Sequence, residues 1–447
     1  MRTGIGRTYL CWATAACLLA GLPCAQAVAD DSTDLRQEAF ANLWNEHADR
    51  AVTQFGTWLR NHPDDRDPDT LRGLALALSW YGLQRRAERV YLELIAADAA
   101  DGDARIGLAR ARIWDNRLRE GWRDLRAVET DQTLDAATRR EAGDFALRVL
   151  DEYTPTAQIT WRGNWDSDDL DIQRLSALGA ATIAHGILVQ TGPRLSYYTQ
   201  PGRPDVTALR WQALAVTGLT PHLSLHAQGW FEHFGSSGPL AGSTDKLDWN
   251  RPGADAWLTW QPVSRLRLDG GAASQPVETY LAFAHKIGFT QENLSGDWRL
   301  TRRLALGASG TRAVYSDGNR RLQGRLQAVW HYEGPLDLDL TASFTHLDFT
   351  RPYPGGYWSP DWVRNGSLAA RAKWYGRRWT LTLEGSVGLE TEAGAEGITV
   401  GGGSGRVGLR VSDRWLIALE AGHSRSSFST ASGYHRTFAG LSLRGVF

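Results

Sequence analysis

The sequence predicts a chain of two parts: N-terminal α-hairpin repeats, followed by an antiparallel transmembrane β-barrel of about 16 strands. Three observations support this fold class. The chain starts with a secretory-type segment, apolar residues recur at spacings of three and four up to residue 153, and a period of two holds from residue 154 to the end. We therefore divide the chain into a signal peptide, residues 1–27, helical repeats, residues 28–153, and a barrel, residues 154–447.

The N-terminal segment has the three parts of a secretory signal. Arg2 and Arg7 precede an apolar run over residues 9–22, and Ala25 and Ala27 supply small residues for cleavage. The run is shorter than the roughly 20 apolar residues of a membrane-spanning helix. All three cysteines fall inside this segment, so we expect the mature chain to have no disulfide and no thiol chemistry. A formal charge of −1 gives no indication of a nucleic-acid partner.

The helical part has an internal period. Shifting the sequence by 34 residues aligns small and apolar residues of the helical runs, which is the tetratricopeptide period. The aligned pairs are Gly82 with Asn116, Ala87 with Gly121 and Tyr91 with Leu125. We expect about three repeats. Such repeats usually hold a partner on a concave surface, and a plug or spacer is the alternative.

The strand part alternates apolar and polar residues, and residues 379–390 show this clearly. One face carries Trp379, Leu381, Leu383, Val387 and Leu389, and the other carries Thr380, Thr382, Glu384, Ser386 and Glu390. Short connections alternate with longer ones, such as Gly235–Asn250 and Thr350–Trp362, which is typical of outer-membrane barrels with short periplasmic turns and long external loops. Both chain ends and the repeats would then be periplasmic. A soluble two-sheet sandwich would also show the alternation, but it would not need so many strands.

The C-terminal strand ends in an aromatic residue, Phe447, with apolar residues alternating before it. This pattern resembles the signal that the barrel-assembly machinery of the outer membrane recognises. We expect outer-membrane lipid and this machinery as partners.

Charged residues of both signs fall on the polar face of the strands. A barrel of this size has room for an aqueous lumen, and charges there avoid the cost of facing lipid. Our candidates for pore-lining residues are Arg210, Arg325, Asp337, Asp339, Arg371, Lys373, Glu384, Arg406, Arg410 and Arg444. The four cations at 371, 373, 406 and 410 would attract anions if unpaired, but acidic residues on neighbouring strands make pairing at least as expected. The alternative is a closed lumen in which the charges satisfy one another.

The loop over residues 351–362 concentrates aromatic residues between prolines and glycines. Aromatic faces stack on sugar rings, and they are equally at home in the interfacial belt of a membrane protein. Our saccharide-contact candidates are Tyr353, Tyr357, Trp358 and Trp362. The acidic loop over residues 166–171 could hold calcium, but it has no fixed ligand spacing and is better explained as a solvated turn. We expect no catalytic residues, no metal and no cofactor.

A signal sequence, helical repeats and a C-terminal barrel together resemble the outer-membrane porins of exopolysaccharide secretion, such as the barrel component of bacterial cellulose synthase and the poly-N-acetylglucosamine porin. The stretch Gly356–Asp361, Gly-Tyr-Trp-Ser-Pro-Asp, is similar to Gly-Tyr-Phe-Ser-Pro-Gln of the cellulose synthase component, and the turn Asp317–Arg320, Asp-Gly-Asn-Arg, resembles one common in these barrels. The short repeat region is closer in size to the small YaiO-type barrels.

The resemblance implies export of an exopolysaccharide, with periplasmic repeats that bind the polymer or a periplasmic protein. A closed-lumen receptor or structural barrel is the alternative. An outer-membrane enzyme is less favoured, because only His346 with Asp348 and His423 with Ser424 hint at one.

Overall fold

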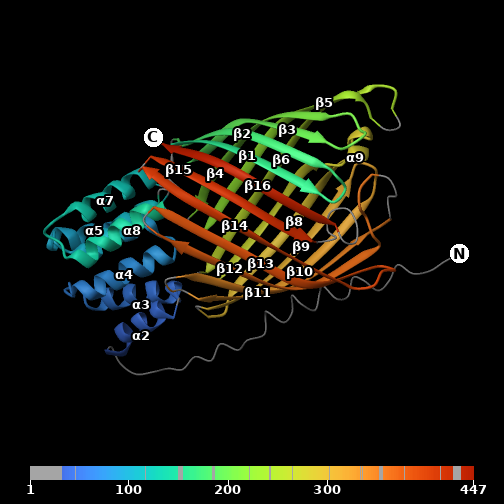
Figure 1. Cartoon of the computed structure of the whole chain (residues 1–447). Coiled ribbons are helices and arrows are strands. Elements are labelled where there is room, and N and C mark those ends of the chain that lie inside the picture. The colour runs from blue at the N-terminus through green and yellow to red at the C-terminus, as the bar shows by residue number, and fades with distance from the viewer. Residues whose placement is uncertain are drawn as a thin grey trace, which may run out of the picture.

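The structure is a computed structural model. It describes residues 33–447 apart from residues 46, 116, 150–154, 184–186, 221, 241–242, 264, 302, 333, 335, 352–355, 377, 413 and 426–433. The predicted signal peptide lies outside the described residues. As expected from the sequence, the described chain has an N-terminal helical region and a closed antiparallel barrel of sixteen strands (Figure 1).

The helical region consists of antiparallel hairpins. The helices are α2 (Thr33–Trp44), α3 (Ala48–Asn61), α4 (Pro68–Trp80), α5 (Gln84–Ala97), α6 (Gly102–Trp114), α7 (Leu118–Thr130) and α8 (Ala136–Val149). The contact between one hairpin and the next repeats itself. Phe55 of α3 packs on Gly73 of α4, and Tyr91 of α5 packs in the same way on Gly107 of α6. Since a Cβ at either glycine would overlap the ring, only glycine allows this close approach.

The barrel follows the order of the sequence. Each strand pairs with its neighbours in the chain, and β1 pairs with β16 to close the sheet. The strands are β1 (Thr156–Asp166), β2 (Asp171–Thr182), β3 (Leu188–Thr199), β4 (Val206–Thr220), β5 (Leu223–Pro239), β6 (Lys246–Val263), β7 (Leu266–Pro276), β8 (Gly288–Arg299), β9 (Leu304–Tyr315), β10 (Arg320–Tyr332), β11 (Asp337–Phe349), β12 (Trp362–Tyr375), β13 (Trp379–Glu392), β14 (Ile398–Ser412), β15 (Trp415–Arg425) and β16 (His435–Val446).

The outer face of the barrel is apolar. Leu209, Leu294, Leu326, Leu368 and Leu389 are all more than half exposed on it, because nothing in the described chain covers them. Exposed tryptophans gather where strands end or begin at one end of the barrel, as in the aromatic girdles of transmembrane barrels. They are Trp260, Trp298, Trp330, Trp374, Trp379 and Trp415.

None of the helices in the described ranges is long and apolar enough to cross a membrane.

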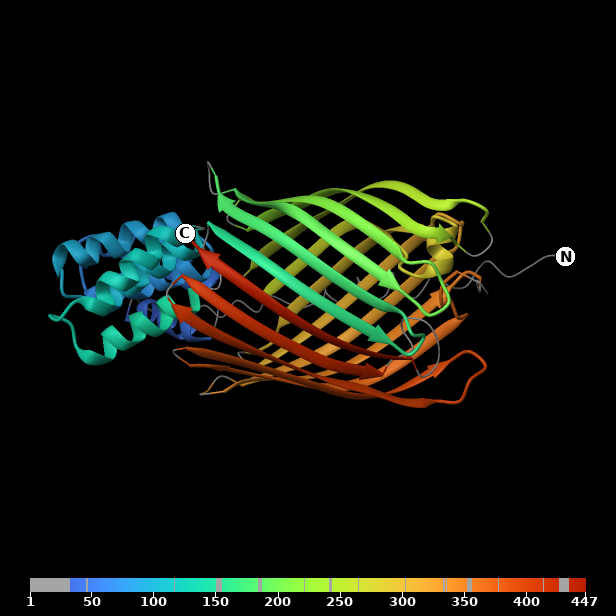
Figure 2. The ribbon, with the colours of Figure 1, turned by 45° about the horizontal axis from the view of Figure 1, so that its top comes forward.

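The two ends of the barrel differ. At the short-turn end, for example between β4 and β5 or β12 and β13, connections are two to five residues long, whereas the long-loop end has connections of four to twelve residues. The helical region lies against the short-turn end (Figures 1 and 2). Here Arg410 of β14 donates a hydrogen bond to the carbonyl oxygen of Leu147, and the rings of Tyr81 and His222 are 4.5 Å apart. Val446, near the end of β16, packs in the apolar core of α6, α7 and α8.

Two connections at the long-loop end differ from the sequence-based expectation. The predicted loop Gly235–Asn250 is wrong, because β5 and β6 continue as a paired ribbon in which Gly235 lies opposite Asp248 and Pro239 opposite Lys246. Hydrogen bonds between the two backbones continue the ribbon beyond the apolar outer surface of the barrel. The alternation of apolar and polar residues has already ended there, so the sequence does not predict this part of the strands. The sequence predicts no element between Val277 and Ile287, whereas the structure has a short helix there, α9 (Tyr280–Ala284).

Candidate functional site

The loop between β7 and β8 folds back into the barrel. Thr279 caps α9 by accepting a hydrogen bond from the amide of Ala282. Tyr280 and Phe283 of this helix are buried, and the ring of Phe283 packs edge-to-face on Tyr198 of β3 at 5.0 Å. Apolar side chains of a loop must be covered somewhere, and here the inner wall of β2 to β6 covers them. The loop therefore narrows the lumen from one side.

The loop between β11 and β12 narrows the lumen from the other side. The ring of Tyr357 stacks on Tyr315 of β9, with centroids 4.6 Å apart, and its hydroxyl donates to Asp317 Oδ2 at 3.0 Å. The hydroxyl of Thr279 donates a hydrogen bond to the carbonyl oxygen of Gly356. The two loops are thus joined across the mouth of the barrel.

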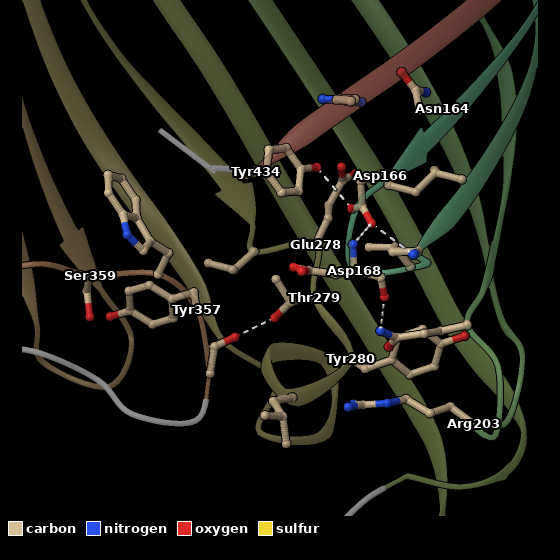
Figure 3. Close-up of a pocket in the computed structure, with 18 of the residues that line it drawn as sticks. Asn164, Asp166, Asp168, Arg203, Glu278, Thr279, Tyr280, Tyr357, Ser359 and Tyr434 are labelled. Atoms are coloured by element: carbon tan, nitrogen blue, oxygen red, sulfur yellow. Dashed lines mark hydrogen bonds between the residues drawn. The ribbon is translucent and has the colours of Figure 1, made fainter. Parts of the chain in front are cut away.

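A cavity of about 900 Å³ opens beside this junction, and we call it the mouth cavity (Figure 3). Asp166 lies in its wall, where Oδ1 accepts hydrogen bonds from the amides of Asp168 and Leu170, and Oδ2 accepts one from the hydroxyl of Tyr434. In the described part of the chain, no group of acidic, histidine or cysteine side chains could hold a metal ion. The acidic loop is a hydrogen-bonded turn.

A second cavity of about 400 Å³ lies farther from the long-loop end, and we call it the arginine cavity. Behind its lining, Glu232 is fully buried and accepts hydrogen bonds from Arg194 at 3.0 Å and from Arg210 at 2.6 Å. Arg174 pairs with Glu278, the residue that precedes the cap of α9. The pair of Arg174 with Glu278 holds the loop to the barrel wall, whereas Glu232 joins two arginines within the wall.

The two cavities share part of their lining. Val277, Glu278, Tyr357 and Trp358 border both of them and therefore lie between them. Any solute that passes from one cavity to the other must move along these four side chains. The junction is thus a constriction that combines one carboxylate with aromatic surface.

The structure places all ten pore-lining candidates on the strand face opposite the exposed apolar side chains. Several of them, on β11 to β14, make polar contacts with other parts of the described chain. Arg371 Nε is 2.9 Å from Glu384 Oε1, Asp339 Oδ1 is 2.5 Å from His331 Nδ1, and Arg410 is bonded to the helical region. Pairing with a charged or titratable side chain therefore accounts for Arg371, Glu384 and Asp339.

The saccharide-contact candidates separate into two groups. Tyr357 and Trp358 border both cavities. Trp362 starts β12 on the face that carries Leu368, so it points away from the lumen. Tyr353 lies outside the described residues.

Sequence reasoning missed residues that build the constriction. Arg174, Arg194, Arg321 and Glu278 were not among the candidates, although all four line the arginine cavity. Near the long-loop end, the inner wall of the barrel also carries apolar side chains, which pack on α9. The alternation of apolar and polar residues therefore does not show which strand face points into the lumen there. The apolar stretch Tyr280–Ala284 in an otherwise polar loop was the available signal for an inward fold.

Aromatic side chains also mark the opposite end of the lumen. Helices α2, α4 and α6 end in Trp44, Trp80 and Trp114, and we call these three side chains the tryptophan row. The rings of Trp44 and Trp80 are 6.2 Å apart, edge to face. Trp80 and Trp114 line a cavity of about 370 Å³ that Arg299 of the barrel closes from the other side. The row therefore lies at the junction between the helices and the short-turn end.

The two sequence hints of an enzyme have different outcomes. His423 and Ser424 are consecutive in β15 and point to opposite faces of the sheet. His346 Nε2 and Asp348 Oδ2 are 3.6 Å apart, and both lie on the outer face of β11.

Among solved structures, one described as a bacterial polysaccharide outer membrane secretin has a TM-score of 0.52, 13% sequence identity, and covers 65% of this chain and 98% of its own. This chain has the fold of an outer-membrane barrel. A FadL homologue of Pseudomonas aeruginosa is less similar, with a TM-score of 0.37, 12% identity, and coverage of 68% of this chain and 94% of its own. No family model matches the sequence. No curated protein matches it either.

Proposed function

We propose that this protein is a porin-like outer-membrane channel for the export of an exopolysaccharide. The observation that carries the proposal is the form of the lumen, which is polar and accessible in the middle and narrows at one end between aromatic and charged side chains. On the inner face, Arg371 and Glu384 remain about half exposed even though they form an ion pair. Space that solvent reaches is therefore left around them.

The constriction suits a sugar chain for physical reasons. The rings of Tyr357 and Trp358 offer flat apolar surface, and Glu278 and the neighbouring arginines offer hydrogen bonds to hydroxyl groups. Aromatic surface with a few placed polar groups is how proteins commonly bind such amphipathic ligands. Passage requires no chemistry, so the protein needs to guide the polymer and to exclude other solutes.

The tryptophan row would receive the polymer. It places aromatic surface beside the short-turn end, next to a cavity that reaches the inner face of β8. In the proposed orientation the helical region is periplasmic, and the repeats bind the polymer itself. The position of the tryptophan row favours a polymer-binding role of the repeats over a role as a spacer. The other helical faces are open to a periplasmic protein partner.

Single-channel recording in planar bilayers tests the proposal. We expect the full-length protein to give steady conductance that added oligosaccharides interrupt. Tyr357→Ala should weaken the block by about tenfold, because ring stacking contributes on the order of 1 kcal/mol beyond buried area. Trp362→Ala is the matched control, since it removes an aromatic residue of the same segment from the outer face, and its block should equal that of the wild type.

If the protein gives no conductance under any condition, the export proposal is rejected, and the closed-lumen receptor or structural barrel is favoured. If the protein conducts but no saccharide interrupts the current, it is a general porin, and the proposal that it transports a saccharide is rejected.

A further inference from the structure

The arginine cavity has an excess of positive charge in its lining. Four strands of the barrel each contribute one guanidinium group, whereas the only carboxylate in the described lining is Glu278 of the β7–β8 loop. The guanidinium groups belong to Arg174, Arg194, Arg210 and Arg321.

Groups behind the lining do not remove this excess. Glu232 is shared by Arg194 and Arg210, so one carboxylate serves two cations. On the next strand Arg251 lies opposite Glu232 in the register, and Asp255 follows on the same face, closer to the short-turn end. Five arginines thus stand against three carboxylates, which leaves two positive charges without a counterpart in this cluster of described residues.

Several donors of these arginines have no acceptor. The Nε atoms of Arg194, Arg210 and Arg321 and the Nη1 atom of Arg251 are buried and have no hydrogen-bond partner among the described residues. A buried donor without an acceptor costs free energy, and the cost is greater when the donor is charged. The charge of an anion in the cavity would lower this cost for Arg194, Arg210 and Arg321, whose side chains line it.

Aromatic side chains form a large part of the remaining lining. Tyr315 and Tyr357 present a stacked pair, and Phe289 lies with its ring 5.9 Å from the guanidinium carbon of Arg321. The volume of about 400 Å³ is within the range of small-ligand pockets. Guanidinium groups that converge on carboxylates and rings that stack on pyranoses together select a sugar that carries a negative charge.

We propose that the arginine cavity binds a carboxylated sugar residue of the exported polymer, a uronate, and that it makes the channel selective for an acidic polysaccharide. This inference rests on the proposed export function and specifies its substrate class. The carboxylate of each sugar binds among the arginines while its ring lies on the aromatic side. Glu278, on the boundary to the mouth cavity, repels the same carboxylate and promotes its release.

Block by a matched pair of ligands tests this site in the full-length protein. One ligand is the trimer of galacturonate, and the other is the same trimer as its methyl ester, which has equal length and no charge. We expect the acid to block at a concentration at least about tenfold lower than the ester. Arg321→Gln should raise the blocking concentration of the acid about tenfold, the value of one charge-assisted hydrogen bond, and leave block by the ester unchanged.

Arg321 is the informative position because its side-chain hydrogen bond is a long contact of 3.5 Å to Gln291, so its replacement breaks no ion pair of the described fold. The matched control is Arg312→Gln on the adjacent strand β9. Arg312 points to the outer face, where it pairs with exposed Glu292, and its replacement should leave block by both ligands at the wild-type level. Equal block by acid and ester, or an equal effect of the two substitutions, would overturn the inference.

A failure of the export proposal can be distinguished from a failure of the uronate inference. If the wild type does not conduct, calorimetric titration of the detergent-solubilised protein with the acidic trimer still decides the inference. Saturable binding that Arg321→Gln weakens about tenfold would support a uronate site in a closed barrel. No binding would reject it.

Discussion

At the scale of single residues, the contact between successive hairpins depends on the absence of a side chain. The repeated pair of an aromatic ring on one helix and glycine on the next sets the distance between the hairpins. At Gly107, a Cβ would lie 2.4 Å from two ring carbons of Tyr91, closer than real contacts allow. Because Tyr91 is itself almost completely buried, its ring has little room to move.

Gly107→Ala should therefore lower the free energy of unfolding of the helical region by about 1 to 3 kcal/mol, the usual cost of overpacking. The measurement is thermal unfolding followed by the helical circular dichroism signal. Gly56→Ala on α3 is the control, because the nearest atom to its new Cβ would be an Arg60 nitrogen at 3.8 Å. It should be neutral or slightly stabilising, since alanine favours a helix. Similar losses in both variants would contradict the packing argument.

At the scale of elements, the β7–β8 loop is held to the barrel wall by polar contacts of Glu278 and by apolar contacts of α9. Glu278 accepts hydrogen bonds from Arg174 and from the hydroxyl of Tyr198 at 3.0 Å, and α9 adds apolar contacts. A helix of one to two turns has little stability of its own, so these contacts keep it inside.

Glu278→Gln should loosen the loop, because it breaks a charged pair inside the barrel and leaves Arg174 without its counter-charge. We expect more frequent switching between conductance levels, with a higher mean current than in the wild type. Glu292→Gln is the control on the outer face, and its current trace should match the wild type. An unchanged trace for Glu278→Gln would show that the loop does not limit the passage.

At the scale of the whole molecule, the helical region should lose stability in acid. Glu88 of α5 accepts hydrogen bonds from Arg112 and Arg117 and so ties three helices together. Burial opposes ionisation of this carboxyl, but the two guanidinium groups outweigh it and lower its pKa below 4.5. A lowered pKa in the folded state adds stability that is complete above the unfolded value and is lost as the pH falls through the folded value.

Calorimetric scans between pH 7 and 3 should therefore show the helical transition moving to lower temperature below about pH 4.5, the ordinary value of a glutamate. Glu88→Gln should lower this transition at pH 7 and flatten its dependence on acid. Glu93→Gln on the same helix is the control, because Glu93 is half exposed and its arginine partner is 3.4 Å away at the surface. A Glu88→Gln transition as acid-sensitive as that of the wild type would reject this role.

The sequence predicts the barrel well because one physical constraint acts on every strand. Lipid on one face and water on the other enforce the period of two, and the strands that show it close into one barrel of sixteen. The constraint ends where the chain leaves the membrane, and there the expectations fail, at the paired ribbon after Gly235 and at α9. The candidate site follows the same division. The apolar-polar alternation identifies Arg210 as a candidate. It does not identify the pair of Arg174 with Glu278, because Glu278 belongs to a loop whose inward path depends on tertiary packing.

The position of Val446 links the closure of the barrel to the core of the helical region. This residue belongs both to the last strand, which closes the barrel against β1, and to the core of α6, α7 and α8. The amide of Phe447 also bonds to the carbonyl oxygen of Pro155, directly before β1. The strand that closes the sheet therefore also contributes a side chain to the helical core. A molecule in which β1 and β16 are not paired would lack Val446 in this core, so the stability of the helical region is coupled to the closure of the barrel.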